Sequence, residues 1–170
     1  MSARNWLPCI DFTLASEGGL TNDAGDPGGL TNFGISQRAY PDLDIARLNQ
    51  NDAETIYRRD YWNKVAGDAL PAGIDLMVFD MAVNAGIGRS AEIFQRCLGV
   101  DADGVIGPAT LAAVQCAAPG PLITAIGAAQ LAFYQALPGW VEFGRGWAAR
   151  VARRVDAATG MLTATTGAST

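Results

Sequence analysis

The sequence predicts a mainly helical α+β domain, with a small β-hairpin or meander near the N-terminus and a helical C-terminal lobe. Three observations carry this prediction. Apolar residues recur at helical spacing along most of the chain, and turn-forming residues crowd into residues 20–35. A length of 170 residues with 49% hydrophobic content is enough for one packed core and is not typical of a disordered chain.

Helical segments account for most of the chain. The first is expected to start at a cap on Asn5, to hold Pro8 in its first turn and to end at Glu17. Its apolar face includes Ile10 and Leu14, four residues apart. Later helices are predicted at 51–63, 71–85, 90–98, from Pro108 onward, at 122–137 and at 144–158.

The segment between the first two helices has a different composition. It contains Asn22-Asp23, Gly25, Asp26-Pro27-Gly28-Gly29 and Gly34, all of them turn formers. Such a cluster between apolar residues is typical of a short, irregular hairpin. The sheet is therefore expected here.

Residue types that are missing exclude several chemistries. The chain has no histidine, which excludes Ser-His and Cys-His nucleophilic pairs and His-ligated zinc or iron sites. Its three cysteines are scattered, without a C-x-x-C pair. Asp101-x-Asp103-Gly104 lacks the later ligands of a calcium loop. We expect no metal and no cofactor, so acid–base chemistry falls mainly to carboxylates.

The charge of the chain limits its possible partners. A net charge of -5 with a pI near 4.5 argues against nucleic acid as a partner. Residues 121–170 are nevertheless basic, and all the basic residues there are arginines: Arg145, Arg150, Arg153 and Arg154. Either these arginines form a solvated helix face, or they contact an anionic surface of the cell envelope.

No stable membrane span is expected. The longest apolar stretch without a charge or a proline is Leu122–Leu137. It is shorter than the roughly 20 residues that a membrane span needs, and it contains glutamines. The first residues do not form a signal peptide, because Asp11 interrupts their apolar stretch. We therefore expect synthesis in the cytoplasm.

Glu17 is the leading candidate for a catalytic residue. It lies on the apolar face at the end of its helix, where both burial and the helix dipole disfavour a negative charge, as a general acid requires. Asp26 follows nine residues later and Thr31 five residues after that, in a segment that can fold back over the helix end. Two carboxyl groups around a sugar are the layout of glycoside hydrolysis. The alternative is that Asp26 only forms a turn.

Several blocks of the sequence resemble a known family. Residues 16–20 (SEGGL) and 26–35 (DPGGLTNFGI) resemble the EGGY…DPGGxTxxGI signature of glycoside hydrolase family 108. This family comprises N-acetylmuramidases of the lysozyme-like superfamily, known from phage endolysins and secretion-associated muramidases. Further blocks resemble the family's central helix, its peptidoglycan-binding segment and its closing element: 79–86, 98–110 and 146–150. Leu20 replaces the tyrosine of the signature.

The resemblance implies a lysozyme-like fold and a set of site residues. Glu17 matches the catalytic glutamate, and Asp26 and Thr31 resemble the Asp and Thr of phage-type lysozymes. By analogy, Asn84 lines the cleft and binds a sugar acetamido group, although it could equally cap its helix. Phe33 and Tyr61 are candidates for stacking on sugar rings, with a place in the core as the alternative.

The implied activity is hydrolysis of the β-1,4 bond between N-acetylmuramic acid and N-acetylglucosamine. Residues 1–95 would form the catalytic region, 96–159 a peptidoglycan-binding-like region of the same compact unit, and 160–170 a disordered tail. We expect a monomeric endolysin that acts on peptidoglycan in the periplasm after release by a holin or an equivalent. The alternatives are a lytic transglycosylase, a secretion-associated muramidase and a non-catalytic peptidoglycan-binding module.

Overall fold

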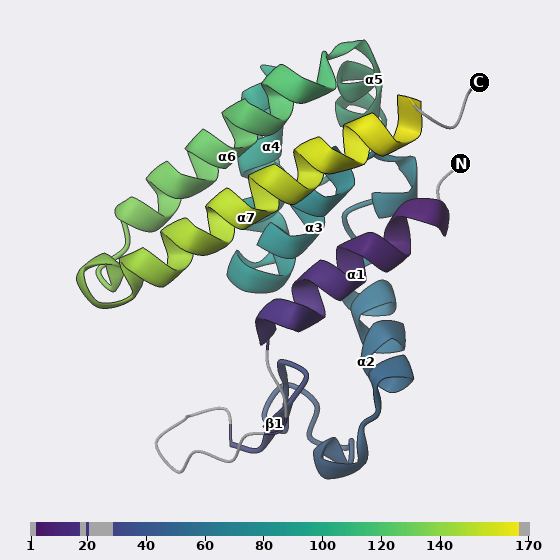
Figure 1. Cartoon of the computed structure of the whole chain (residues 1–170), viewed down its shortest axis with the longest axis vertical. Helices are drawn as coiled ribbons and strands as arrows, with labels where there is room; N and C mark the ends of the chain where they lie inside the picture. The colour runs from purple at the N-terminus through teal and green to yellow at the C-terminus, as the bar shows by residue number, and fades with distance from the viewer. Residues whose placement is uncertain (1–2, 18–19, 21–28, 167–170) are drawn as a thin grey trace.

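The computed structural model describes residues 3–17, 20 and 29–166 (Figure 1). A helical lobe forms most of the molecule, and a small lobe with one hairpin lies below the end of the first helix. The α-helices are α1 (Ala3–Glu17), α2 (Gln50–Tyr57), α3 (Ile74–Ala85), α4 (Ile87–Leu98), α5 (Pro108–Cys116), α6 (Pro119–Gln135) and α7 (Trp140–Thr166). The strands are β1 (Thr31–Asn32) and β2 (Ile35–Ser36), and short 3-10 or π-helical turns occupy Ile45–Arg47, Arg58–Trp62 and Gly67–Ala69.

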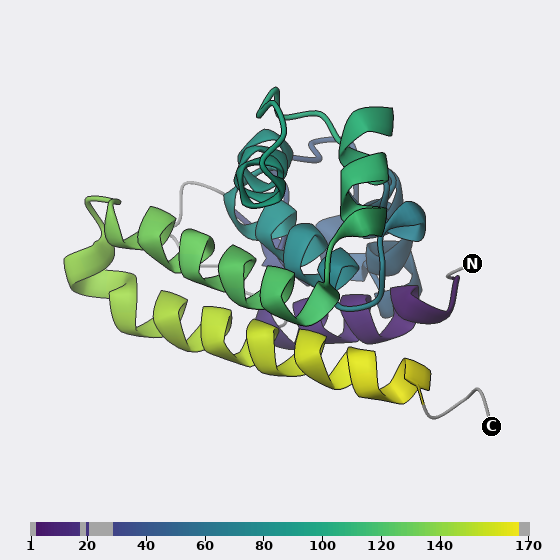
Figure 2. The ribbon, with the colours of Figure 1, turned by 90° about the horizontal axis from the view of Figure 1, so that it is seen from above.

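The helical lobe is built around α3. Nearly every residue of this helix is buried, as expected for a helix that is apolar on all sides. It packs against α1, α4, α6 and α7, while α6 and α7 run side by side in opposite directions along one face (Figure 2). Ile123 and Ile126 of α6 complete the core on that face. Side chains on α3 can therefore meet side chains from both ends of the chain.

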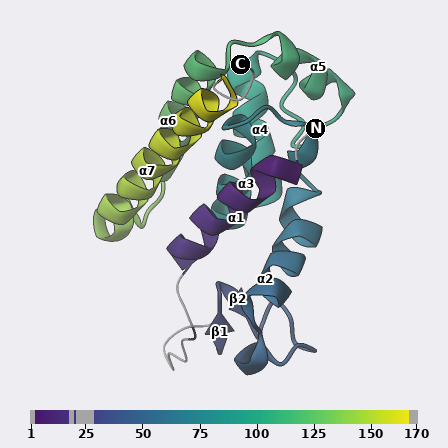
Figure 3. The same cartoon turned by 45° about the vertical axis from the view of Figure 1, so that its right-hand side comes forward.

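The small lobe contains the predicted hairpin (Figure 3). β1 and β2 pair antiparallel, with Thr31 opposite Ser36 and Asn32 opposite Ile35. Buried Asn32 donates from Nδ2 to the carbonyl oxygens of Ile45 and Leu48, which ties the hairpin to the following loop. Among the described residues, β-strands pair only in this hairpin. Residues 21–28 of the segment predicted to form it lie outside the described part of the chain.

The first helix differs from its prediction at its start. α1 begins at Ala3, so Asn5 is not its cap and Pro8 lies in its interior. Instead, Nδ2 of Asn5 donates to Oδ2 of Asp75 at 2.8 Å, at the start of α3. The local capping pattern was overridden because this polar side chain found a partner 70 residues away.

The last helix is longer than predicted. α7 continues to Thr166, so the prediction of a disordered tail from residue 160 is wrong for residues 160–166; residues 167–170 lie outside the described part. The physical reason is that Met161 and Leu162 pack against the core, which stabilises a segment whose composition alone favours disorder. Among the described helices, none has the length and apolar character to cross a membrane.

Candidate active site

Glu17, the last residue of α1, forms an ion pair with an arginine of α7. Nη2 of Arg150 donates to Oε1 of Glu17 at 2.6 Å. Both side chains are largely shielded, with 20% of the Glu17 and 12% of the Arg150 side-chain surface exposed. The guanidinium places a positive charge against the carboxyl group.

The same arginine is bound to a buried carboxylate. Arg150 donates from Nη2 to Oδ1 of Asp80 at 2.8 Å and from Nε to Oδ2 at 3.1 Å. Asp80 also accepts from Nε of Arg154 at 2.6 Å and from the hydroxyl of Thr13 at 3.0 Å. Burial alone would raise the pKa of Asp80, but the charges of Arg154 and Arg150 hold that pKa below its usual range.

This network fixes the position of Arg150. Arg154 is fully buried, and its Nη1 donates to Oε1 of Gln130 on α6 at 2.5 Å. The nearby carboxylates of Glu17 and Asp80 formally balance the two arginines. Because Arg150 is bonded to α3 as well as to α1, its guanidinium is oriented before any substrate binds.

The hairpin turn lies against Glu17. Phe33 and Gly34 connect the two strands with φ angles of 52° and 75°, the pattern of a type I′ turn. A bulky residue at positive φ is strained, and the hydroxyl of Tyr57 holds this one by donating to the Phe33 carbonyl at 2.9 Å. A Cβ on Gly34 would lie 2.9 Å from Oε2 of Glu17 and 2.7 Å from the Tyr57 hydroxyl. Glycine is therefore required sterically as well as for its backbone angle.

The two carboxyl oxygens of Glu17 have different surroundings. Oε1 is occupied by Arg150, whereas Oε2 points toward Gly34 and receives no hydrogen bond from any residue that the structure describes. Burial raises the pKa of the Tyr57 phenol, and the negative charge of Glu17 raises it further. Oε2 thus borders the hairpin turn and the phenol of Tyr57.

The other two predicted catalytic residues are placed less completely. Thr31 lies in β1, in the same hairpin whose turn meets Glu17, and its hydroxyl donates to the Gly29 carbonyl at 3.3 Å. It makes no hydrogen bond to Glu17. Asp26 lies outside the described residues, so its role stays a prediction.

The predicted substrate-binding residues lie in three different parts of the fold. Asn84 is exposed in the last turn of α3, where its Oδ1 accepts from the Tyr134 hydroxyl at 2.7 Å. Phe33 lies in the hairpin turn and is partly buried against the core. Tyr61 is also partly buried, with its ring centroid 5.6 Å from that of Tyr57. Burial raises the pKa of Tyr61, and the charges of Asp60 and Glu17 add to this effect.

Sequence reasoning missed the role of Arg150. The arginines of the last helix were expected to share one environment, either a solvated face or an envelope-binding surface. Arg145 and Arg153 are exposed, but Arg150 is mostly shielded and Arg154 is fully buried. For these two, a solvated helix face was wrong, because paired carboxylates inside the fold compensate their burial. The sequence signal that could have found them is the position of Arg150 and Arg154 at helical spacing from the apolar residues on the inner face of α7.

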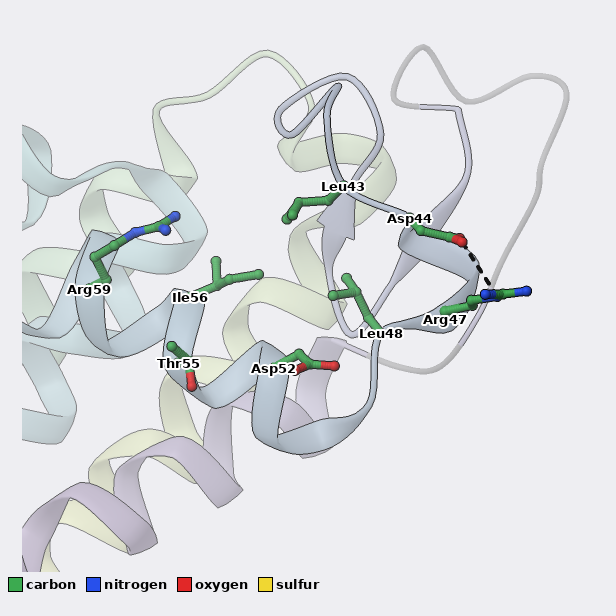
Figure 4. Close-up of a pocket in the computed structure, with 8 residues that line it drawn as sticks. All are labelled: Leu43, Asp44, Arg47, Leu48, Asp52, Thr55, Ile56 and Arg59. Atoms are coloured by element: carbon green, nitrogen blue, oxygen red, sulfur yellow. Dashed lines mark ion pairs between the residues drawn. The ribbon is translucent and has the colours of Figure 1, made fainter.

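A pocket of about 390 Å³ lies elsewhere, beside the outer face of α2 (Figure 4). Asp44 and Arg47 at its rim form an exposed ion pair at 3.5 Å. Neither Glu17 nor Arg150 is among its lining residues, and its volume alone does not make it a catalytic site. The lining residues are Leu43, Asp44, Arg47, Leu48, Asp52, Thr55, Ile56 and Arg59. Within the described residues, no group of three or more metal-ligating side chains gathers.

A helical lobe and a small hairpin lobe with a glutamate at their junction define a lysozyme-like protein. Residues 10–86 match the family model of glycosyl hydrolase 108, and residues 89–152 match that of a predicted peptidoglycan domain. The structure of SagA from Brucella abortus is similar over 94% of this chain and 97% of that chain, with 37% sequence identity and a TM-score of 0.85. No curated protein matches the chain.

The chain therefore belongs to the glycosyl hydrolase 108 family. It is a glycoside hydrolase that acts on peptidoglycan, and it has a lysozyme-like fold. The predicted family and fold class are confirmed.

Proposed function

We propose that the protein is an N-acetylmuramidase. It hydrolyses the β-1,4 bond between N-acetylmuramic acid and N-acetylglucosamine, with Glu17 as the general acid. The observation that supports this most is the asymmetry of the Glu17 carboxyl group, in which Arg150 binds Oε1 while Oε2 has no partner among the described residues. A general acid needs one such oxygen, held in a fixed direction and open to the glycosidic oxygen.

In the proposed reaction, Glu17 takes up a proton from water on Oε2 while Arg150 stays bound to Oε1. Oε2 then gives this proton to the glycosidic oxygen as the bond from that oxygen to the sugar carbon breaks. The electron pair of the bond leaves with the oxygen, and the sugar carbon becomes oxocarbenium-like. Glu17 is then a carboxylate, and the charge-assisted hydrogen bond from Arg150 stabilises it. Arg150 therefore acts at the step in which negative charge develops on Glu17.

A second carboxylate completes the proposal. Asp26, helped by Thr31, stabilises the cationic carbon or orients the water that attacks it. The support for Asp26 is its spacing from Glu17 in the sequence. Thr31 is supported by its place in the hairpin whose turn touches Glu17.

Three further residues are proposed to contact the sugars. Nδ2 of Asn84 has no acceptor among the described residues and is exposed, so it is free to donate to an acetamido carbonyl. Phe33 lies in the hairpin turn and accepts from the Tyr57 hydroxyl through its carbonyl oxygen, and Tyr61, after α2, packs its ring against that of Tyr57. Both are proposed to present ring surface to the substrate.

The test is digestion of purified peptidoglycan, followed by mass spectrometry of the released fragments. Wild type should release fragments with reducing muramic ends, while Glu17→Gln, which keeps the shape but cannot donate the proton, should release none. Glu142→Gln is the matched control, because Glu142 is exposed on α7. Anhydro-muramic ends would instead identify a lytic transglycosylase. Binding without fragments from wild type would identify a non-catalytic module.

We further propose that the protein acts as a monomeric phage or prophage endolysin. It would be made in the host cytoplasm and would reach peptidoglycan in the periplasm through a holin or an equivalent. The support is the sequence resemblance to the endolysins of this family. Expression with and without a co-expressed holin tests the role, and lysis should require both proteins. Export and wall cleavage without a holin would favour a secretion-associated muramidase.

A further inference from the structure

The proposed reaction leaves unused a cluster of aromatic rings where α6 and α7 meet. We call this cluster the aromatic wall: Tyr134 of α6 with Trp140, Phe143 and Trp147 of α7. The Trp147 ring lies at its centre, with centroids 5.5 Å from Tyr134, 5.9 Å from Phe143 and 6.5 Å from Trp140. Phe143 is 52% exposed and both tryptophans are half-buried. This end of the two helices projects beyond α3 (Figures 1 and 2).

Two glycines show that the rings are packed in place. A Cβ on Gly144 would lie 2.5 Å from Cδ2 of Trp140, so this ring covers the helix backbone. A Cβ on Gly139 would lie 3.1 Å from Cη2 of Trp147 and 3.3 Å from Cδ2 of Phe143. Rings fixed in this way lose little conformational entropy when a ligand binds to them.

The aromatic wall lies along α7, the helix whose Arg150 binds Glu17. Phe143, Trp147 and Arg150 follow one another at i, i+4 and i+7, so they share one face of α7. At 1.5 Å per residue, Trp147 lies about 5 Å and Phe143 about 10 Å along the helix axis from Arg150. The wall also reaches α3, because the Tyr134 hydroxyl donates to Asn84. A chain molecule bound at Glu17 could therefore extend along α7.

We propose that the aromatic wall is a subsite for a sugar ring of the peptidoglycan glycan strand, beyond the two sugars at the cleaved bond. The proposal rests on the proposed function. The C–H face of a sugar ring is apolar and its rim is polar, which suits the exposed face of Phe143 and the half-buried Trp147. The ring faces carry the contact, and the sugar hydroxyls remain in water.

The surroundings of the wall favour a glycan over a larger apolar partner. On α7, the large apolar side chains that are exposed are Val141 and Phe143, and the charged residues Glu142 and Arg145 are exposed between and beside them. A membrane or a second copy of the chain would require a wider continuous apolar surface. One or two sugar rings need only the small apolar surface that the aromatic side chains of the wall offer.

The experiment uses the full chain with Glu17→Gln, so that bound glycans are not cleaved. The probes are peptide-free glycan strands of alternating N-acetylglucosamine and N-acetylmuramic acid, a tetrasaccharide and an octasaccharide. Phe143→Ser should weaken binding of the octasaccharide about three- to tenfold and leave the tetrasaccharide unchanged. Val141→Ser is the matched control, because Val141 is 97% exposed on the same turn of α7, and it should change neither.

A second measurement needs no substitution in the wall. The indole N–H resonance of Trp147 should shift on saturation with the octasaccharide and not with the tetrasaccharide. With Glu17 restored, Phe143→Ser should raise KM on long strands and leave kcat unchanged, because only binding outside the reacting sugars is lost.

Three outcomes would overturn the subsite. The first is an equal effect of Phe143→Ser and Val141→Ser on octasaccharide binding, and the second is an unshifted Trp147 indole resonance. The third is that Phe143→Ser weakens binding to phosphatidylglycerol vesicles but not to the octasaccharide. In each case wild type would still cleave peptidoglycan. Failure of the proposed function looks different, because wild type would then release no fragments with reducing muramic ends, whether or not the oligosaccharides bind.

Discussion

Nη2 of Arg150 lies 2.6 Å from Oε1 of Glu17, so a residue 133 positions later in the chain orients the acidic residue at the end of α1. Glu17 lies in the part of the chain that matches glycosyl hydrolase 108, whereas Arg150 lies in the part that matches the predicted peptidoglycan domain. The two matched regions therefore meet in one ion pair, and the position of the Glu17 side chain in the first depends on the packing of the second.

Removing Arg150 should lower kcat. Arg150→Ala takes away a charge-assisted hydrogen bond, and we expect kcat on peptidoglycan to fall about ten- to hundredfold. Arg150→Lys should recover only part of this loss, because an ammonium cannot bridge Glu17 and Asp80 as the planar guanidinium does. Arg153→Ala, on an exposed position of the same helix, is the control. Rates of Arg150→Ala within twofold of wild type would refute this role.

Neutralising Asp80 should destabilise the fold. Asp80→Asn leaves the guanidiniums of Arg150 and Arg154 close together without their shared buried carboxylate. We expect the free energy of unfolding to fall by about 3–5 kcal/mol, measured by urea denaturation at pH 7. Asp156→Asn, at an exposed position of α7, should change it little. An equal effect of the two substitutions would contradict the importance of the network.

Asp80 should also make the fold sensitive to acid. Its folded-state pKa is lowered from 3.8, so the folded state binds the proton less tightly than the unfolded state. Its stabilising contribution is therefore complete above about pH 3.8 and is lost as pH falls through the folded pKa. The difference in unfolding free energy between wild type and Asp80→Asn should shrink below pH 3.8. A constant difference down to pH 2 would rule this out.

Asp75 should have the opposite pH dependence. Burial raises the pKa of this carboxyl group from 3.8 to about 6, although Asn5 and the Leu76 amide donate to it. Its contribution to stability is thus greatest below about pH 3.8 and decreases by up to about 3 kcal/mol as pH rises through 6. Asp75→Asn should flatten the fall in unfolding free energy between pH 4 and 6.5. Exposed Asp101→Asn should leave that fall intact, and an unchanged slope in Asp75→Asn would be the contrary result.

Gly34 and Gly29 offer a matched comparison at the hairpin. Both have positive φ, 75° and 71°, so alanine should cost each about 1 kcal/mol of backbone strain. Only at Gly34 would the new Cβ collide with Oε2 of Glu17 and the Tyr57 hydroxyl; at Gly29 it meets nothing within 4 Å. Gly34→Ala should therefore lose most of its activity, while Gly29→Ala loses only stability. Similar activities in the two variants would show that the turn does not border the reacting oxygen.

The helices were predictable because their signals are local. The predicted helices at 71–85 and 122–137 correspond to α3 and α6, which begin and end within three residues of the expected positions. The hairpin was expected within 20–35, and its strands occupy 31–36. Periodicity of apolar residues and turn chemistry act over a few residues, so they can be read directly from the order of the residues.

The errors have a different origin. Asn5 was expected to cap α1 but bonds to Asp75, and residues 160–166 were expected to be disordered but extend α7. In each case a contact with a distant part of the chain outweighed the local preference. A sequence pattern cannot contain such contacts, because their energy depends on which helices become neighbours.

The sequence by itself determined the class of the protein and predicted Glu17 as its general acid. The lack of histidine left carboxylates for the chemistry, and the motif around Glu17 pointed to a glycoside hydrolase of peptidoglycan. Only the tertiary structure decided how Glu17 is held, because its partner Arg150 becomes a neighbour when α7 packs against α3. The physical reason is that a charged side chain can be buried only beside an opposite charge, and here that charge comes from a distant part of the chain. In the sequence, Arg150 and Arg154 have the character of surface residues. In the fold, both pair with buried Asp80 and lie in the interior.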